Sequence, residues 1–341
     1  MLAWRSVDGC AMQTATLARI AALPLVVTTQ ELRRAGLDPD IARRAVGAGA
    51  WTQLFPHTWL RTTGPAQRAH LVTAALGLAG PGAVLTGADG CAAIGLRDIP
   101  RQPSVAVLLP AHVRRAPRPG ITWLHTQEPV TAQRHGAHHV AEPERAILDA
   151  ARLSGSLRDV RALLCEGVRD GWTSVDAQRA ALLDGPRRHR RLAHSALDSI
   201  AEGARSAPEC ELADALRPAV AAGRLAVLLN PQVLIDGALV CCPDAYIVGS
   251  ALGVELDSKR HHGGEQDFEA TLRRHDRAAA YGLMLLHVTP QTLRRGPGAY
   301  RELVCAAVEA RLAGGLREPA GLTVLPCGPP VAGQTRAQRQ R

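Results

Sequence analysis

Between positions 243 and 262, apolar residues occur in short runs, and residues typical of turns separate these runs. Two of these runs, 246–248 and 251–254, flank Gly249 and Ser250. A Gly-Ser pair between two apolar runs is typical of a tight connection between strands. We therefore expect two antiparallel strands joined by a turn.

Acidic residues accompany both predicted strands. Asp244 opens the first strand, and Glu255 and Asp257 close the second. Because side chains alternate between the faces of a strand, Glu255, Asp257 and Lys259 share one face, and Asp244 can reach it across the turn. Like charges on a half-buried sheet are costly unless a cation neutralises them, and carboxylate oxygens suit Mg²⁺ or Mn²⁺. The pattern predicts a metal site formed by Asp244, Glu255 and Asp257. The alternative is a solvated strand edge whose acids pair with arginines.

Lys259 adds a second chemical feature to this stretch. Of the 40 Lys and Arg residues in the chain, only Lys259 is a lysine. An ammonium group can orient or deprotonate a water molecule, whereas a guanidinium group stays protonated. His261 is the other candidate for this role. The catalytic hypothesis therefore comprises Asp244, Glu255, Asp257, Lys259 and His261.

The same stretch resembles the core of PD-(D/E)XK nucleases, in the version related to very-short-patch-repair (Vsr) endonucleases. Asp244, the turn, residues 255–258 and the pair His261-His262 carry the resemblance. Further segments extend it over about residues 205–312: Ser206–Glu209, Asn230–Gln232, Arg273–Arg277, Tyr281–Leu283 and Leu285–Pro290.

The resemblance implies a restriction-endonuclease-like, three-layer α/β domain over residues 201–312. It also implies Mg²⁺-dependent hydrolysis of phosphodiester bonds in DNA. This chain departs from the family at Asp257, which stands where the family signature has a lysine. Lys259, two residues further on, is then the candidate for the lysine's role.

The N-terminal residues 1–65 predict a small helical module that ends in a hairpin. The phrase 28–31 is a capping box, in which the Thr28 side chain caps a helix and Glu31 reaches back. Asp38 and Pro39 predict the start of a third helix, and Pro56-His57 predicts a turn between two strands. This order of elements outlines a winged helix.

Arg43 and Arg44 lie on the predicted third helix, which in winged helices can enter the major groove of DNA. The alternative is that both arginines only solvate one face of that helix. Residues 66–200 mix helix and strand and form a predicted α/β middle domain. Both regions resemble the AbiEi-family antitoxins of type IV toxin–antitoxin systems. The N-terminal module does so through its order of elements and phrases such as VVTTQELRRAGLDPDIARRAV, and the middle region through a proline-arginine phrase that ends in aspartate, here Pro143, Arg145 and Asp149. The resemblance implies a cognate toxin as a partner.

Composition bears on partners and on compartment. The net charge is +9 and the pI is about 9.7, which favours polyanionic partners such as DNA. Eight cysteines show no zinc-ligand spacing. No apolar run approaches the ~18 residues of a membrane helix, so we expect a cytoplasmic protein without membrane contact. Residues 313–341 predict a disordered tail.

Together these patterns predict an α/β multidomain protein that binds DNA and carries a metal-dependent endonuclease-like domain. The alternative is a non-enzymatic transcriptional repressor or antitoxin with a degenerate nuclease fold. The oligomeric state stays open.

Overall fold

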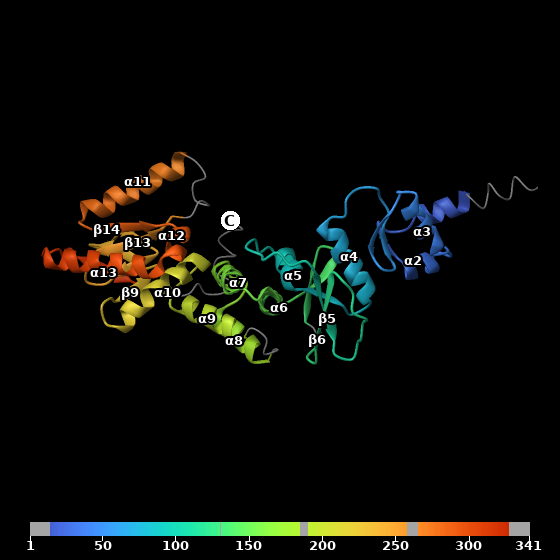
Figure 1. Cartoon of the computed structure of the whole chain (residues 1–341), viewed down its shortest axis with the longest axis horizontal. Coiled ribbons are helices and arrows are strands. Elements are labelled where there is room, and N and C mark those ends of the chain that lie inside the picture. The colour runs from blue at the N-terminus through green and yellow to red at the C-terminus, as the bar shows by residue number, and fades with distance from the viewer. Residues whose placement is uncertain (1–13, 130, 185–189, 258–264, 327–341) are drawn as a thin grey trace, which may run out of the picture. The chain divides into compact units, whose positions relative to one another are not determined.

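The computed structural model describes residues 14–129, 131–184, 190–257 and 265–326. The chain forms two compact units (Figure 1). Unit one comprises Met1–Gly95 and Arg101–Asp149, and unit two comprises Leu96–Pro100 and Ala150–Arg341. Several sheets and many helices confirm the α/β multidomain class. In the described residues, no helix has both the length and the apolar character needed to cross a membrane.

The N-terminal part of unit one is a three-stranded antiparallel sheet, in the order β1-β3-β2, with helices before and between its strands. Its elements are β1 (Val26–Thr28), α2 (Thr29–Arg34), α3 (Asp40–Gly47), β2 (Thr52–Phe55) and β3 (Thr58–Leu60). The capping box is confirmed: the Thr28 side chain accepts a hydrogen bond from the Glu31 N–H, and the Glu31 carboxylate accepts one from the Thr28 N–H. Leu32 and Trp59 pack in the core beneath. The turn at His57 is also confirmed, with a φ of 68°.

The rest of unit one is built on a five-stranded sheet in the order β6-β5-β4-β8-β7. Its elements are α4 (Arg68–Ala79), β4 (Val84–Thr86), α5 (Gly87–Ile94), β5 (Val105–Pro110), β6 (Ile121–Thr126), β7 (Ala132–His135) and β8 (His138–Ala141). Helix α6 (Pro143–Ser154) follows and continues into unit two. Buried Asp149 accepts hydrogen bonds from Thr86 and Arg145, each of 2.8 Å. This network fixes α6 to β4.

Unit two begins with helices and continues with two sheets. The helices are α7 (Leu157–Arg169), α8 (Val175–Asp184), α9 (Arg190–Ala201) and α10 (Ala207–Ala221). The remaining elements are β9 (Val227–Leu229), β10 (Gln232–Ile235), β11 (Ala238–Cys241), β12 (Ala245–Ile247), β13 (Leu252–Leu256), α11 (Glu265–Ala280), β14 (Met284–Val288), α12 (Pro290–Arg295), α13 (Pro297–Ala313) and β15 (Leu322–Leu325).

The main sheet of unit two has four strands in the order β14-β13-β12-β9. Strands β9, β12 and β13 pair antiparallel, and β14 pairs parallel with β13. A parallel neighbour requires a crossover connection, and α11 provides it between β13 and β14. Figure 1 shows α11 on one side of these strands and α13 on the other. The sheet is therefore covered by helices on both faces.

Strand β15 corrects the predicted disordered tail over residues 313–341. Residues 322–325 pair antiparallel with β10 and complete a small sheet in the order β11-β10-β15. Leu322 and Val324 alternate along the strand and pack on the core cluster that contains Val233 and Tyr246. Glu318, just before the strand, accepts a hydrogen bond from the Tyr246 hydroxyl. The prediction of a disordered tail rested on the many prolines in this segment and overlooked the short apolar alternation. Residues 327–341 lie outside the described part of the chain.

Candidate functional site

The predicted antiparallel strand pair is confirmed, and its register brings the acidic residues together. Ala245 pairs with Val254 across β12 and β13. Asp244 and Glu255 are the next residues outward on each strand, so they face one another at the same end of the hairpin. Asp257 lies two residues beyond Glu255, where its N–H donates to the Val288 carbonyl of β14. Strand alternation places Glu255 and Asp257 on one face.

Asp244 is the most perturbed acid of the group. Its Oδ2 accepts a hydrogen bond of 2.6 Å from the Leu256 N–H. The pKa of Asp244 is raised from 3.8 to about 7. Burial is the largest cause, the negative charges of Glu209, Glu255 and Asp257 also raise the pKa, and the Leu256 hydrogen bond lowers it. A carboxyl group whose pKa is raised by burial and by three other negative charges is one that a nearby cation would favour in its ionised form.

Glu209 belongs to this group through the start of α10. Ser206 caps the helix by accepting from the Glu209 N–H, and the Ser206 hydroxyl donates to the Glu209 carboxylate. The Asn230 side chain also donates to Glu209, and the Asn230 N–H donates to the Asp244 carbonyl at 3.0 Å. Asn230 therefore links the end of β9 to both acids. Glu209 is buried, which is consistent with a positioning role rather than a surface ion pair.

His287 is a site residue that sequence reasoning missed. It lies on β14 in register with Glu255 of β13, and its Nδ1 is 3.1 Å from Oδ1 of Asp257. The ring centroid of His275 on α11 lies 4.7 Å from that of His287. The alternation of side chains along the predicted strand 285–288 could have shown that His287 lies on the opposite face from Leu286 and Val288. The contact between His287 and Asp257 arises from the parallel pairing of β13 with β14. This pairing joins distant segments, so it cannot be predicted from the residues around His287.

Tyr300 on α13 is also close to the acidic group. Burial and the negative charge of Asp257 raise the pKa of the Tyr300 phenol. Its hydroxyl is buried and, within the described residues, makes no hydrogen bond. A buried hydroxyl without a partner is costly, so this group is a candidate ligand contact beside Asp257.

Asp244, Glu255 and Asp257 have the oxygen donors that a divalent cation needs, but their side chains do not converge on one point. In the part of the chain that the structure describes, no three His, Cys, Asp or Glu side chains converge as a metal centre would require. Hard oxygen donors from Asp244, Glu255 and Asp257 are nevertheless the set that Mg²⁺ prefers. Lys259 and His261 lie outside the described residues.

Arg43 and Arg44, the predicted DNA contacts, are both exposed on α3 in unit one. Arg43 forms an ion pair with Asp40 one turn earlier, and Arg44 lies in the last turn of the helix. Ala42 and Leu32 point into the core instead. The two arginines therefore extend from the outer face of α3.

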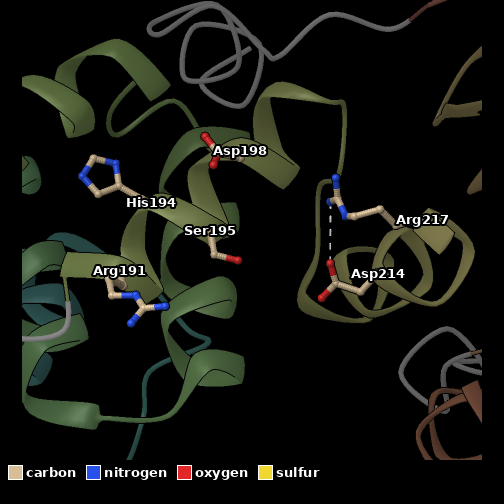
Figure 2. A pocket seen from close by; sticks show the side chains of 6 residues that line it. All are labelled: Arg191, His194, Ser195, Asp198, Asp214 and Arg217. Carbon is tan, nitrogen blue, oxygen red and sulfur yellow. Dashed lines mark ion pairs between the residues drawn. The ribbon is translucent and has the colours of Figure 1, made fainter. Parts of the chain in front are cut away.

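A cleft of about 360 Å³ lies between α9 and α10 in unit two. Figure 2 shows the side chains that line it: Arg191, His194, Ser195 and Asp198 from α9, and Asp214 and Arg217 from α10. Arg217 pairs with Asp214 at 3.6 Å, and Asp198 pairs with Arg179 at 2.9 Å. Both carboxylates are thus already neutralised, and we assign this cleft no ligand.

Comparisons with known proteins give a structural likeness but no match to a family. No protein-family model matches the chain, and no curated protein matches it. The crystal structure of the Rv2827c protein from Mycobacterium tuberculosis is similar, with 21% identity and a TM-score of 0.39 over 59% of this chain and 80% of that chain. A likeness of this strength carries no functional argument.

Proposed function

We propose that this protein binds DNA and that unit two hydrolyses phosphodiester bonds with a divalent cation. The observation that carries the proposal is the register of β12 and β13, which places Asp244 opposite Glu255 at one end of the hairpin, near enough to Asp257 for both negative charges to raise the pKa of Asp244. Carboxylates from adjacent strands are the means by which many phosphodiesterases hold Mg²⁺.

The topology of unit two supports a restriction-endonuclease-like domain. A helix, α10, is followed by an antiparallel series β9, β12 and β13, a crossover helix α11 and a parallel strand β14. This order supports the arrangement that the resemblance to Vsr-like PD-(D/E)XK proteins implies, in which the second and third strands carry the metal ligands. The hairpin β10–β11 lies between β9 and β12 along the chain.

In this proposal each residue has a defined role. Asp244 and Glu255 hold Mg²⁺ or Mn²⁺, which when bound stabilises negative charge on the phosphate, and Asp257 contributes a third carboxylate. Lys259 or His261 orients the attacking water. His287 fixes the orientation of Asp257 through the 3.1 Å contact, while Glu209 and Asn230 hold the start of β12.

The N-terminal module supplies DNA affinity in the same proposal. The winged-helix proposal is supported by the order of elements: helices α2 and α3 precede the β2–β3 hairpin, and β1 completes the sheet. The exposed Arg43 and Arg44 on α3 would contact the major groove or the phosphate backbone. The net charge of +9 favours the encounter with DNA.

A non-enzymatic repressor or antitoxin, with a cognate toxin as partner, is the second candidate function. It is favoured by Asp257, which occupies the signature lysine position and contacts His287. A side chain with acidic oxygens there does not supply the positive charge that the signature lysine would place beside the phosphate. In that case the winged helix acts on an operator, and the nuclease-like domain serves only for interaction.

A cleavage assay separates the two candidates. Full-length protein is incubated with supercoiled plasmid and with oligonucleotide duplexes in Mn²⁺, Mg²⁺ or EDTA. The nuclease proposal predicts nicked or linear product with metal only, and none from Glu255→Ala. The matched control is Glu309→Ala, which removes an exposed acid on α13 and should cut as the wild type does. If wild type and Glu255→Ala give equal amounts of product, the cleavage arises elsewhere.

A further inference from the structure

Unit one contains a basic loop that the proposed function does not yet use. The loop joins β5 to β6 over residues 111–120 and carries Arg114, Arg115 and Arg118. Because β5 and β6 pair parallel, the loop must cross from the end of one strand to the start of the other. Arg114 and Arg115 are exposed and Arg118 is half-buried. The loop therefore presents a row of guanidinium groups at the surface of unit one.

The end of the loop lies against the turn of the β2–β3 hairpin. Nη1 of Arg118 donates a hydrogen bond of 3.2 Å to the Pro56 carbonyl. Gly120 has a φ of +80°, and an added Cβ there would lie 3.0 Å from Cε1 of Phe55, so this close approach needs a residue without a side chain. Residues 56–57 and 111–120 thus form one continuous surface, the hairpin–loop surface.

Further hydrogen bonds fix the conformation of the loop. The indole N–H of Trp123 donates to the Ala116 carbonyl at 2.9 Å. Nε and Nη2 of Arg115 donate to the Ala79 carbonyl, at the end of α4, at 3.0 and 2.6 Å. Two prolines within the loop also fix their own φ angles. A segment that is ordered before it binds loses less conformational entropy on binding, so the loop is preorganised for a partner.

The hairpin–loop surface carries positive charge without any acid of its own. Residues 41–88 and 99–127 contain no Asp or Glu, and these ranges include the whole hairpin and the whole loop. Backbone carbonyls, rather than carboxylates, accept the hydrogen bonds of Arg115 and Arg118. By contrast, Arg43 on α3 pairs with Asp40. The charge of the loop therefore stays available to a polyanion.

We propose that the hairpin–loop surface binds the phosphate backbone of duplex DNA. This inference rests on the proposed DNA binding by the N-terminal module, whose β2–β3 hairpin is part of the surface. Arg114 and Arg118 are four residues apart, so their Cα atoms are separated by at most about 14 Å, which corresponds to about four base steps. Contacts to phosphate position a protein on DNA without reading the bases. The β5–β6 loop thereby extends the DNA contact beyond α3 and adds affinity that does not depend on base sequence.

The test compares two double variants of the full-length protein on duplexes of unrelated sequence, by fluorescence anisotropy over a salt series in EDTA. Arg114→Gln with Arg118→Gln removes two cations of the loop. Arg101→Gln with Arg134→Gln removes the same charge from exposed positions of unit one outside the loop and is the matched control. Because Arg118 also contacts the hairpin, the single variant Arg114→Gln repeats the test with that contact intact.

The loop double variant should bind each duplex about tenfold more weakly than the wild type. Its slope of log affinity against log salt concentration should fall by about 1.8, because each phosphate that is no longer neutralised contributes about 0.9. Arg114→Gln alone should lower the slope by about 0.9, and the control should keep the wild-type slope. If the loop variants match the control, the inference is overturned while DNA binding by Arg43 and Arg44 stands. A wild type without salt-sensitive duplex binding overturns the proposed function and this inference together.

A second arm tests the other common polyanionic surface with vesicles that contain phosphatidylserine. We expect the loop double variant to change duplex binding whether or not vesicles bind. If it loses binding to vesicles but keeps the wild-type slope on duplexes, the surface belongs to a membrane contact and the inference is overturned.

Discussion

The Asp244 carboxylate accepts a 2.6 Å hydrogen bond from the Leu256 N–H across the β12–β13 hairpin. This contact fixes one oxygen of a partly buried acid beside Glu255 and Asp257. Burial and the neighbouring charges raise its pKa to about 7 even though this hydrogen bond favours the ionised form. The fold therefore holds Asp244 near acids whose charges repel its ionised form, and the proposed cation would relieve this repulsion.

Stability should depend on pH through Asp244. Its folded-state pKa of about 7 lies above the unfolded value near 3.8, so the folded state binds more protons between these values. The stabilisation is complete below about pH 4 and disappears as pH rises through 7. We expect the free energy of unfolding to fall by on the order of 2–4 kcal/mol over this range from this group alone. Denaturant unfolding of wild type and Asp244→Asn checks this.

Asp244→Asn should flatten that pH dependence, because the amide oxygen still accepts from Leu256 but no longer ionises. Added Mn²⁺ should flatten the wild-type profile as well, because a bound cation lowers the pKa of Asp244. Equal slopes for wild type and Asp244→Asn without metal would show that another group controls the profile.

Arg43 and Arg44 should contribute DNA affinity in a salt-dependent way. Replacing both by Ala is expected to weaken duplex binding and to reduce the slope of log affinity against log salt concentration by about 0.9 for each phosphate that the variant no longer neutralises. Arg101→Ala with Arg134→Ala removes the same charge from other exposed positions of unit one. Fluorescence anisotropy over a salt series checks this. Equal slopes for the two double variants would assign the effect to net charge alone.

Lys259→Arg tests the acid–base role that the sequence predicts for the single lysine. Charge and approximate length are kept, so the variant should fold and bind metal as the wild type does. Loss of a positioned acid–base group typically lowers the rate by about 10²–10⁴-fold. Single-turnover cleavage measures it. A rate equal to wild type would transfer the role to His261 or to Asp257 with the metal.

Gly253 allows the close approach of β13 to its neighbours. An added Cβ would lie 2.7 Å from Cδ2 of Leu285 and 3.0 Å from Cβ of Pro243. Overpacking of this kind costs about 1–3 kcal/mol, so Gly253→Ala should lower the free energy of unfolding by that amount. Gly47→Ala in α3, where an added Cβ meets nothing within 4 Å, is the control and should be neutral or stabilising. If both variants unfold alike, the packing at Gly253 is looser than the structure indicates.

Sequence patterns predicted the turns and helix starts, because these features are determined by residues that are close together in the chain. The β12–β13 hairpin follows from two apolar runs around Gly249-Ser250, and the start of α2 follows from the Thr28–Glu31 capping box. Contacts between distant segments were not predictable in this way. His287 meets Asp257 only because β14 pairs parallel with β13.

Strand β15 illustrates the same limit at the end of the described chain. Its alternation is only four residues long and follows a proline, Pro319, so composition favoured a disordered tail. Pairing with β10 supplies the stabilisation that the segment lacks by itself.

The proposed chemistry depends on a divalent cation held by Asp244, Glu255 and Asp257. A calorimetric Mn²⁺ titration of the full-length protein reports this binding without relying on cleavage. It is made at about pH 8, where Asp244 with a pKa of about 7 is ionised. We expect saturable binding to the wild type and to Glu309→Ala, and binding at least tenfold weaker in Glu255→Ala. A wild type that binds Mn²⁺ no better than Glu255→Ala would contradict the proposed site.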